Sequence, residues 1–531
     1  MYLHLQSVFI IFVVGSVWSH KNVSELKFPP WFKFGAATAA YQIEGGWNIS
    51  DKSPSIWDVF THESPGMISD GGAGDEACDS YRLWREDVKI VADLGLDFYR
   101  FSISWPRLLP SGFPDRISSA GRRYYSELID GLLAAGVEPV VTVYHWDLPQ
   151  SLQDLGGWTN PLISDWFADY ARVVFSLYAD RVKTWITINE PVIYCDASYT
   201  MGVAPKVQSP EIGLYLCKKH ALIAHAKAWR IYDKEFKPKY HGKVSLSNLI
   251  MWFEPDDDGE EEVAELARQY GGGMYSHPIY SKEGGWPPAI EQLIAKRSLE
   301  QGYPRSRLPA FTEHEIQLTR GTYDFYGLNY YTARLTRRAR SGERIGIWPF
   351  SGISELNITF TTRPEWKKAP PFWFYIYPEG LRHLMTWLRD QYGDMEFFIT
   401  ETGVSDYDGR LHDVDRVEYY QKHLEQVLLS IHEDHVNVTG FTAWTLMDDF
   451  EWIDGYRSKF GLYAVDFSDQ QRRRTPRTSA VYYRNVVHTG SITPPKYSPY
   501  SDNGVTNKIF SCTNLYSLII TVYYVLDFQN C

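Results

Sequence analysis

Cysteine is scarce in this sequence, with five residues scattered over 531 positions at Cys78, Cys195, Cys217, Cys512 and Cys531. That number and spacing exclude a disulfide-built scaffold and a zinc site of paired CxxC motifs, although one or two disulfide bridges stay open. We therefore expect no metal site. Stability must come from a hydrophobic core, and a content of 44% apolar residues is ample for a large one.

Positive charge is also in deficit, because 65 acidic residues outnumber 53 lysines and arginines and give a net charge of -12. This balance argues against a general attraction to nucleic acid or to an acidic membrane surface. The chain also lacks a GxGxxG or P-loop motif after an early strand, so the phosphate cradle of a nucleotide-binding fold is missing. We expect neither a nucleic-acid partner nor a cofactor.

Long hydrophobic runs are missing too. The apolar run Val8–Val14 is short for a membrane span and small residues follow it, which predicts a cleaved secretory signal peptide over residues 1–19 rather than a membrane anchor. A second run, Leu515–Leu526, is also short and is followed by polar residues. It is interpreted as a lipid-anchor signal, a lid-like tail or an irregular segment, and membrane anchorage is not expected.

Four N-x-S/T sequons fit passage through the secretory pathway. They predict a secreted, extracellular glycoprotein with glycans at Asn22, Asn48, Asn357 and Asn437. The sequence leaves open whether the protein forms a homodimer.

Aromatic residues are present in excess, at 16% of all positions and including 19 tryptophans. Aromatic rings combine a flat apolar face with a polar edge and suit the C–H faces of sugars. A large core can also absorb surplus tryptophan. Composition alone therefore does not decide between a sugar site and a core.

Short β-rich runs alternate with amphipathic stretches along most of the chain, which is the pattern of parallel strands joined by helices. Helical spacing is found in Ser80–Leu94, Pro161–Leu177, Leu214–Glu235 and Asp415–His432. The strand-like runs number eight: Lys33–Ala37, Phe98–Ser102, Pro139–Tyr144, Thr184–Ile188, Lys243–Ser247, Phe325–Asn329, Glu396–Thr400 and Gly440–Trp444. Eight such units predict an α/β fold, a single (β/α)8 TIM barrel over residues 20–492, with an irregular tail over 493–531. An open doubly wound sheet is the alternative.

Two glutamates stand in similar settings near the ends of the fourth and seventh predicted strands, Glu190 in Thr187–Pro191 and Glu401 in Ile399–Gly403. A barrel gathers the carboxyl ends of its strands on one face, so residues this far apart in sequence can meet there. Glycoside hydrolysis needs such a pair, one carboxyl group to protonate the leaving oxygen and one to attack or to activate water. A single glutamate at a strand end is more often a salt-bridge or capping residue, so only the matched pair favours catalysis.

These two segments resemble the TxNEP and ITExG signatures of glycoside hydrolase family 1, the family of β-glucosidases and myrosinases. The resemblance extends over almost the whole chain. Further segments that resemble the family's motifs are Phe32–Gly45, Tyr99–Trp105, Tyr144–Pro149, Gly327–Thr332 and Asp449–Trp452. So many motifs in the same order are not expected by chance.

The resemblance implies a retaining β-glycosidase that releases glucose from the non-reducing end of a β-glucoside or an oligosaccharide. Glu401 is expected to attack the anomeric carbon, and Glu190 to protonate the departing oxygen and then deprotonate water. Two inversions then preserve the configuration, and the carboxyl groups should lie roughly 5 to 5.5 Å apart. Glu190 should be neutral when substrate arrives. The residues that match positions around the nucleophile are Arg100, Asn329 and Tyr331.

Recognition of a pyranose requires polar groups beside indole rings. The residues that match the family's sugar-binding positions are Gln42, His145, Trp146, Asn189, Glu451 and Trp452, with Trp444 as the stacking floor. Asn189 is expected to hold the 2-hydroxyl, a contact that strengthens in the transition state. Trp373 matches the family's platform for the aglycone.

The sequence departs from the family pattern at Thr402, which stands where the family usually has Asn, so hydrogen bonding around the nucleophile is expected to differ. A second feature is a basic cluster after the sixth predicted strand, expected in a loop on the active face and made of Arg334, Arg337, Arg338 and Arg340. The cluster is interpreted either as a solvated loop or as a site for an anionic aglycone such as the sulfate of a glucosinolate.

Three alternatives to an ordinary O-glucosidase follow. An anionic aglycone site would indicate a myrosinase, but plant-type myrosinases carry Gln where this chain has Glu190, which favours the O-glucosidase. A transglucosidase would share every residue named above. A non-catalytic sugar-binding relative would be expected to lack one carboxylate, and both are present.

Overall fold

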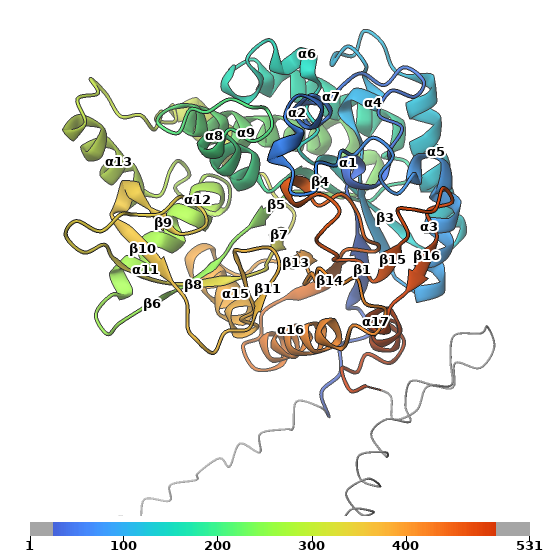
Figure 1. The fold of residues 1–531 in the computed structure, drawn as a ribbon. Coiled ribbons are helices and arrows are strands. Elements are labelled where there is room, and N and C mark those ends of the chain that lie inside the picture. The colour runs from blue at the N-terminus through green and yellow to red at the C-terminus, as the bar shows by residue number, and fades with distance from the viewer. Residues whose placement is uncertain (1–24, 495–531) are drawn as a thin grey trace, which may run out of the picture. The chain divides into compact units, whose positions relative to one another are not determined.

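The computed structural model describes residues 25–494 (Figure 1). The predicted signal peptide, the sequon at Asn22, the run Leu515–Leu526 and the tail beyond residue 494 lie outside the described residues, as do Cys512 and Cys531. The chain divides into two units, Met1–Ile492 and Thr493–Cys531. Within residues 25–494 no helix has the length and apolar character that a membrane crossing needs.

Eight parallel strands form a closed barrel (Figure 1). Their order around the barrel is β1-β2-β3-β4-β5-β7-β13-β14, and β14 pairs with β1 to close it. The strands are β1 Lys33–Ala37, β2 Phe98–Ser102, β3 Glu138–Tyr144, β4 Thr184–Asn189, β5 Lys243–Leu249, β7 Tyr326–Asn329, β13 Phe397–Thr402 and β14 Val438–Trp444. Each coincides with a predicted strand to within about two residues at either end. The TIM-barrel prediction is confirmed, and the doubly wound alternative is wrong because the sheet closes.

Helices return the chain from the end of one parallel strand to the start of the next. The longer ones are α3 Ser80–Leu94, α5 Ser119–Ala134, α7 Ile163–Tyr178, α9 Gly213–Ile231, α13 Pro288–Glu300, α15 Glu379–Tyr392, α16 Val414–His432 and α17 Thr478–Thr489. The shorter ones are α1 Ala40–Ile43, α2 Ile56–Glu63, α4 Trp105–Leu108, α6 Gln150–Gln153, α8 Ser198–Met201, α10 Lys237–Tyr240, α11 Glu261–Arg268, α12 Met274–Tyr280 and α14 Glu313–Thr319. The four stretches with helical spacing correspond to α3, α7, α9 and α16.

Helix α3 shows why these segments are helical and where they stop. Its buried apolar residues recur three or four positions apart and so form one stripe: Trp84, Val88, Val91 and Leu94. The helix ends at Gly95, whose φ of 70° is left-handed and favours glycine. A Cβ at Gly95 would also lie 2.6 Å from the ring of His488 in α17, so the same glycine permits close packing of two helices.

The barrel interior changes from apolar to polar along the strands. One level is a small apolar cluster of Phe98, Val140, Ile186, Phe325 and Phe398. Side chains alternate along a strand, so two residues farther on Arg100, Thr142 and Thr400 share that interior. The Arg100 guanidinium donates from Nε to Thr142 Oγ1 at 3.0 Å and from Nη1 to the Thr400 carbonyl at 2.7 Å. This polar level lies toward the carboxyl ends of the strands, where TIM barrels carry their active sites.

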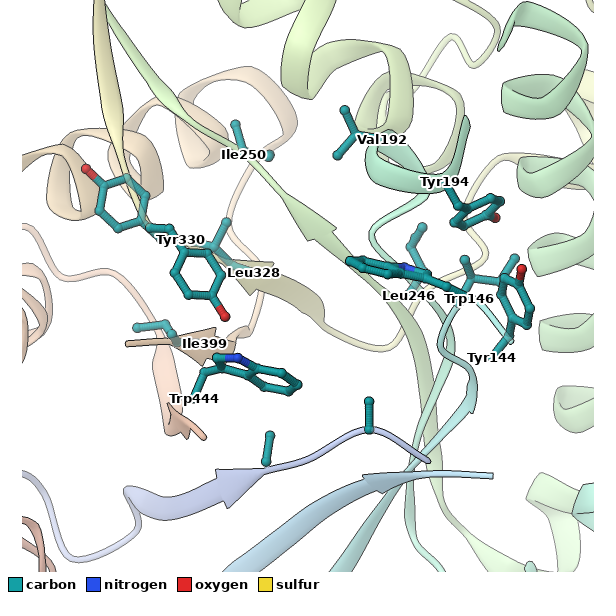
Figure 2. Close-up of a cluster of buried hydrophobic side chains, with 14 of the residues drawn as sticks. Tyr144, Trp146, Val192, Tyr194, Leu246, Ile250, Leu328, Tyr330, Ile399 and Trp444 are labelled. Atoms are coloured by element: carbon teal, nitrogen blue, oxygen red, sulfur yellow. The ribbon is translucent and has the colours of Figure 1, made fainter. Parts of the chain in front are cut away.

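Buried apolar side chains also gather near the carboxyl ends of the barrel strands (Figure 2). Leu328 of β7 and Ile399 of β13 come from neighbouring strands, and Trp444 is the last residue of β14. All three are buried and belong to the large core cluster that also includes residues of the surrounding helices. Leu328 and Ile399 alternate with Asn329 and Thr400 along their strands, so they pack on the helix side while the polar side chains face the barrel interior.

Beside the barrel lies a four-stranded sheet in the order β6-β8-β10-β9 (Figure 1). Its strands are β6 Trp252–Pro255, β8 Ala333–Arg338, β10 Ile358–Thr361 and β9 Gly352–Ile353, and two small ladders join β11 Lys368–Ala369 to β12 Phe374–Tyr375 and β15 Tyr463–Val465 to β16 Arg474–Pro476. The expected basic loop is wrong, because Arg334, Arg337 and Arg338 lie in β8, which pairs with β6 and β10. Only Arg340 lies beyond the strand.

Candidate active site

The strand pairing is irregular next to both glutamates, Glu190 directly after β4 and Glu401 within β13. The pairing of β4 with β5 shifts between Ile186 and Asn189, and that of β13 with β7 shifts between Ile399 and Glu401. Such irregularities occur next to active sites because they re-aim a side chain. Glu190 also has a φ of 45°, a costly left-handed backbone for a residue with a Cβ.

Glu401 is buried between a cation and a phenol. Arg100 Nη1 donates to Glu401 Oε1 at 2.6 Å, and the Tyr331 hydroxyl donates to Oε2 at 2.9 Å. Only 3% of Glu401 is exposed. Both carboxylate oxygens therefore have a donor, and one donor carries a positive charge, an arrangement that favours an ionised carboxylate.

Glu190 has a different environment, although it is equally buried. Asn329 Nδ2 donates to Glu190 Oε1 at 2.6 Å, and the Glu190 backbone N–H donates to the Ser247 carbonyl at 2.8 Å. Among the described residues no cation lies within salt-bridge distance of this carboxyl group. A neutral amide supports the charged form less than a guanidinium does.

These environments separate the two carboxyl groups in acidity. Burial raises the pKa of Glu190 well above its ordinary range, and the nearby charge of Glu401 raises it further. Burial also raises the pKa of Glu401, but Arg100 and the Tyr331 hydroxyl oppose that rise. The first proton taken up by the pair therefore resides on Glu190. The predicted separation of the two carboxyl groups stays a prediction.

A chain of hydrogen bonds fixes the orientation of the neighbouring side chains. Arg100 Nη2 donates to Asn189 Oδ1 at 2.7 Å, and because a guanidinium has only donors, that oxygen is the acceptor. Asn189 Nδ2 then faces His145 Nε2 at 3.0 Å, so Nε2 accepts and the imidazole is neutral. Burial and the Arg100 charge likewise lower the pKa of His145 well below its usual value.

Gln42 and Glu451 form a second polar pair near Glu401. Gln42 Nε2 donates to Glu451 Oε2 at 3.2 Å and to the Phe450 carbonyl at 3.1 Å, while its Oε1 is buried without a partner in the described structure. Burial raises the pKa of Glu451 well above its ordinary range, and the Asp449 and Glu401 charges raise it further. The pair thus has unused hydrogen-bonding capacity, as sugar hydroxyls require.

Aromatic rings form the wall of the site. Trp146 and Trp452 lie 4.4 Å apart, and the His145 ring stacks on Trp444 at 5.9 Å and on Trp452 at 6.0 Å. Trp146 Nε1 donates to the Asn189 carbonyl at 2.9 Å, which ties this wall to β4. Three buried indoles beside neutral polar groups make a surface suited to a pyranose.

Trp373 lies farther out, next to Tyr331 at a ring distance of 6.5 Å. It is half-buried, whereas its neighbour Phe372 is 62% exposed. Rings of Phe350 and Phe372 are 5.5 Å apart and continue the aromatic surface toward solvent. The structure therefore brings Trp373 to the outer side of the site, beyond the residues that surround Glu401.

The basic cluster is largely neutralised by the protein. Arg337 pairs with Glu343 at 2.7 Å and Arg338 lies 3.9 Å from Glu262. Arg334 is buried and donates to the carbonyls of Phe350, Ala333 and Trp373. Burial lowers the pKa of Arg334 to about 10. Arg334 thus serves the backbone that carries the outer aromatic rings.

Thr402 does not hydrogen-bond to the nucleophile. Its Oγ1 lies 2.7 Å from the Tyr419 hydroxyl of α16 and so makes its hydrogen bond away from Glu401. The sequons at Asn48, Asn357 and Asn437 are exposed.

Sequence reasoning missed several residues that support the site. Ser247 and Thr400 hydrogen-bond to Asn329, and no motif marked Ser247 because its role depends on a contact between strands. A disulfide joins Cys195 to Cys217, directly beyond Glu190. The sequence had left open one or two bridges without assigning partners, and spacing alone cannot assign them.

Comparison with known proteins places the chain among glycosidases. The model for Glycosyl hydrolase family 1 matches residues 24–491. Myrosinase 1 of Brevicoryne brassicae is 45% identical over 471 residues, 88% of this chain and 99% of the relative. The cytosolic beta-glucosidase of Homo sapiens is 41% identical over 474 residues, with coverage of 88% and 99%.

Solved structures agree with the sequence relatives. An aphid myrosinase superposes with a TM-score of 0.83 at 45% identity, covering 88% of this chain and all of that one. A mutant of the rice beta-glucosidase Os3BGlu6, in a covalent complex with glucose, superposes with a TM-score of 0.78 at 34% identity, covering 86% and 98%. That neighbour holds a glycosyl-enzyme of the kind a double displacement requires.

Proposed function

The chain belongs to glycosyl hydrolase family 1 and is a retaining β-glycosidase, and from that premise we propose that it hydrolyses β-glucosides with Glu401 as nucleophile and Glu190 as acid/base. One observation carries this assignment. Both carboxyl groups are buried, but Glu401 contacts a guanidinium and a phenol whereas Glu190 contacts an amide. The better-stabilised anion is the nucleophile, and the group that holds its proton longer is the acid.

In the first step Glu401 Oε attacks the anomeric carbon from the α face as the bond to the aglycone oxygen breaks. Glu190 transfers its proton to that oxygen, so the aglycone leaves as a neutral alcohol or phenol. The charge of Glu401 disappears into the ester, which removes one cause of the raised pKa of Glu190. Glu190 is then a carboxylate at the moment when a base is needed.

In the second step water enters from the side that the aglycone has left. Glu190 takes a proton from the water as its oxygen attacks the anomeric carbon, and the ester bond to Glu401 breaks. The two inversions leave the product in the β configuration. Arg100 and Tyr331 receive the returning carboxylate without rearrangement, because their donors already point at its two oxygens.

The proposed glycone subsite combines donors, acceptors and rings. Gln42 Oε1 and Glu451 supply acceptors for sugar hydroxyls, and the orientation of Asn189 presents its NH2 group near His145. The stacking surface is formed by Trp444, with Trp146 and Trp452 beside it. Trp373 is proposed as the platform of the aglycone because it continues this surface outward past Tyr331.

An O-linked aglycone is favoured over a glucosinolate. Glu190 supplies a proton that an alkoxide or phenoxide needs and that a good thiolate leaving group does not. Two guanidinium groups of the predicted anion-binding cluster are also engaged by the protein itself, since Arg337 pairs with Glu343 and Arg334 donates to backbone carbonyls.

Thioglucoside hydrolysis is retained as the second candidate on one observation. Arg334 is a buried cation with no carboxylate within salt-bridge distance among residues 25–494, and it donates to the Trp373 carbonyl. A sulfate on the aglycone would supply the missing negative charge. The similarity to an aphid myrosinase is compatible with this candidate. Transglycosylation, in which an alcohol replaces water, would use the same residues.

We further propose that residues 1–19 direct secretion, that residues 20–492 form the catalytic domain with a separate tail, and that the protein is glycosylated. The exposure of Asn48, Asn357 and Asn437 supports glycosylation. Because relatives include a cytosolic beta-glucosidase, the compartment needs its own test. A full-length chain expressed in insect cells should appear in the medium and lose mass on treatment with an endoglycosidase.

A substrate panel tests the proposed specificity. Purified protein is assayed with aryl β-glucosides, aryl β-galactosides, cellobiose and a glucosinolate, at equal concentrations. We expect the highest kcat/KM on β-glucosides with O-linked aglycones. A higher kcat/KM on the glucosinolate, lost in Arg334→Met, would select the second candidate. Released glucose alone indicates hydrolysis, whereas glucosides of an added alcohol indicate transfer.

A further inference from the structure

The amide of Asn329 lies between the strand that carries Glu190 and the strand that carries Glu401. Its Nδ2 donates to Glu190 Oε1 at 2.6 Å and to Asn189 Oδ1 at 3.2 Å. Its Oδ1 accepts from Ser247 Oγ at 2.8 Å and from Thr400 Oγ1 at 2.7 Å. The two ends of an amide are similar in shape but opposite in polarity, so a half-turn would reverse what Glu190 contacts.

The two hydroxyl groups behind Asn329 act as one unit. Ser247 Oγ and Thr400 Oγ1 lie 2.6 Å apart, and both residues are fully buried. Each hydroxyl donates its proton to Asn329 Oδ1, and the two lone pairs of that oxygen accept both. The amide oxygen is therefore held by two donors, and deleting either hydroxyl removes one of them.

The opposite end of the amide faces a fixed acceptor. Arg100 has only donors, so Asn189 Oδ1 accepts from it and cannot turn away without leaving the cation unpaired. A turned Asn329 would place its own oxygen against Asn189 Oδ1. It would also place an oxygen against the carboxylate form of Glu190. The hydroxyl pair and Asn189 thus favour the same orientation.

We propose that Ser247 and Thr400 are positioning residues for the acid/base, acting through Asn329 to keep its NH2 group on Glu190 Oε1. This proposal rests on the proposed role of Glu190. Ser247 acts twice, since its carbonyl also accepts the Glu190 backbone N–H at 2.8 Å. With Oε1 occupied by the amide, the transferable proton of Glu190 resides on Oε2. The hydroxyl pair thereby determines which oxygen meets the leaving group.

The amide of Asn329 also affects the acidity of Glu190. A donated N–H stabilises the carboxylate form of Glu190 and so lowers the pKa of Glu190 against the larger effects of burial and Glu401. Ser247 and Thr400 carry no charge, so replacing them leaves the charged and titratable groups that face Glu190 in place: Arg100 of β2, Glu401 of β13, and Tyr331 and Glu451 after β7 and β14. A change in titration on their removal would therefore come through Asn329.

The test compares hydroxyl-deleting and hydroxyl-keeping variants of the full chain. Thr400→Val and Ser247→Ala delete one hydroxyl each, and Thr400→Ser keeps it. Thr442→Val is the matched control, because Thr442 is a buried residue of β14 whose Oγ1 has no hydrogen-bond partner among the described residues. The readouts are the pH profile of kcat/KM and its dependence on the pKa of a series of phenol leaving groups.

We expect Thr400→Val and Ser247→Ala to move the basic limb of kcat/KM to higher pH, since this limb reports the acid of the free enzyme. We also expect about a tenfold loss on poor leaving groups and a smaller loss on activated ones. Thr400→Ser and Thr442→Val should keep the wild-type limb. A variant that is merely unstable is recognised by its lower melting temperature. The test then rests on the variant that deletes the other hydroxyl.

A failure of the positioning role can be distinguished from a failure of the Glu190 assignment. If Thr400→Val and Ser247→Ala lose activity equally on all leaving groups and keep the wild-type limb, the hydroxyls are structural and the proposal is wrong. Glu190→Ala is measured in parallel on the same phenol series. Should that variant show no preference for activated leaving groups, the assignment of Glu190 itself fails. A preference in Glu190→Ala without any effect of the hydroxyls overturns the positioning role alone.

Discussion

The carboxyl ends of β4 and β13 look alike in sequence, since each closes an apolar run with threonine nearby and then glutamate. In the structure they differ in what other strands bring to them. Arg100 from β2 and Tyr331 after β7 contact Glu401, whereas Glu190 contacts the amide of Asn329. The residues that other strands bring to each glutamate, and not the local motif, therefore determine the chemical role of each carboxyl group.

The two ends also differ in how they are held. Beyond Glu190, the π-helix Val192–Ala197 is joined to α9 by the disulfide Cys195–Cys217 and by the buried ion pair of Asp196 and Lys218 at 2.5 Å. Beyond Glu401, Gly403 packs on the Trp444 carbonyl, where a Cβ would come within 1.8 Å. The acid/base end is therefore held by a disulfide and an ion pair, and the nucleophile end is held by close backbone packing.

The largest expected effect is at the nucleophile end. Glu401→Gly should reduce turnover on the order of 10⁴-fold or more, because no covalent intermediate can form. Azide fills the space left by the carboxylate and attacks an activated aryl β-glucoside from the α face. The measurement is the anomer of the glucosyl azide by NMR, expected to be α. Rescue that gives the β anomer would place the nucleophile elsewhere.

Glu190→Ala should have a smaller and selective effect. Loss of the proton donor slows glucosides of poor leaving groups by about 10² to 10⁴-fold, whereas dinitrophenyl glucosides leave without protonation. Azide should now attack the glycosyl-enzyme and give the β anomer, the reverse of the result at Glu401. A loss of equal size across the leaving-group series would contradict the division of roles between the two ends.

The disulfide beyond Glu190 is expected to stabilise the folded protein. The disulfide closes a loop with a sequence separation of 22. Replacing both cysteines, in Cys195→Ala with Cys217→Ala, should cost about 3 kcal/mol and lower the melting temperature by about 3 °C. Cys78→Ser is the control, since Cys78 is a buried free thiol. Equal melting temperatures for the double variant and the wild type would show that the loop needs no covalent link.

The smallest expected effect is on folding stability, and it comes from burying the acid Glu190 where its ionised form is disfavoured. The pKa of Glu190 is raised in the folded state by burial and by the Glu401 charge. The folded state therefore favours the protonated form, and its stability falls as pH rises above about 4.5, the ordinary pKa of glutamate. Glu190→Gln keeps the acceptor for Asn329 but cannot ionise. It should melt about 1 °C higher than wild type at pH 7 to 8, with no gain near pH 4.

Glu254→Gln is the control of opposite sign. Glu254 is half-buried, which alone would raise its pKa, but hydrogen bonds from His383 and Tyr377 outweigh burial and lower the pKa of Glu254 to about 2. Its ionised form stabilises the fold above pH 4.5, and that contribution is lost as pH falls toward 2. Glu254→Gln should therefore lower the melting temperature at pH 7. A gain in both variants would refute this account of Glu190.

The fold could be predicted from sequence because its signal is local and repeated. Each barrel strand is a short apolar run, and each long helix carries a stripe such as that of α3. The side sheet was not predicted, because β8 carries arginines that indicate a loop. Its arginines are instead paired with a carboxylate just beyond the strand, that of Glu343, and with a backbone carbonyl from a more distant segment, that of Trp373.

Within the site, only the residues that lie in family motifs could be predicted from the sequence. Glu190, Glu401 and Arg100 could be named because they match family patterns, and the structure brings the residues predicted around them together. The bonds that orient them could not be predicted. Ser247 reaches Asn329 only through the pairing of β5 with β7, and a serine within a strand carries no signal of its own.

Trapping the covalent intermediate tests the central claim most directly. An activated 2-deoxy-2-fluoro-β-glucoside forms the glycosyl-enzyme quickly and releases it slowly, because fluorine disfavours the oxocarbenium-like transition state. Wild-type protein is incubated with the reagent, digested with a protease and mapped by mass spectrometry. The account predicts one fluoroglucosyl group on Glu401 and none on Glu190. A label on Glu190, or on any residue other than Glu401, would contradict it.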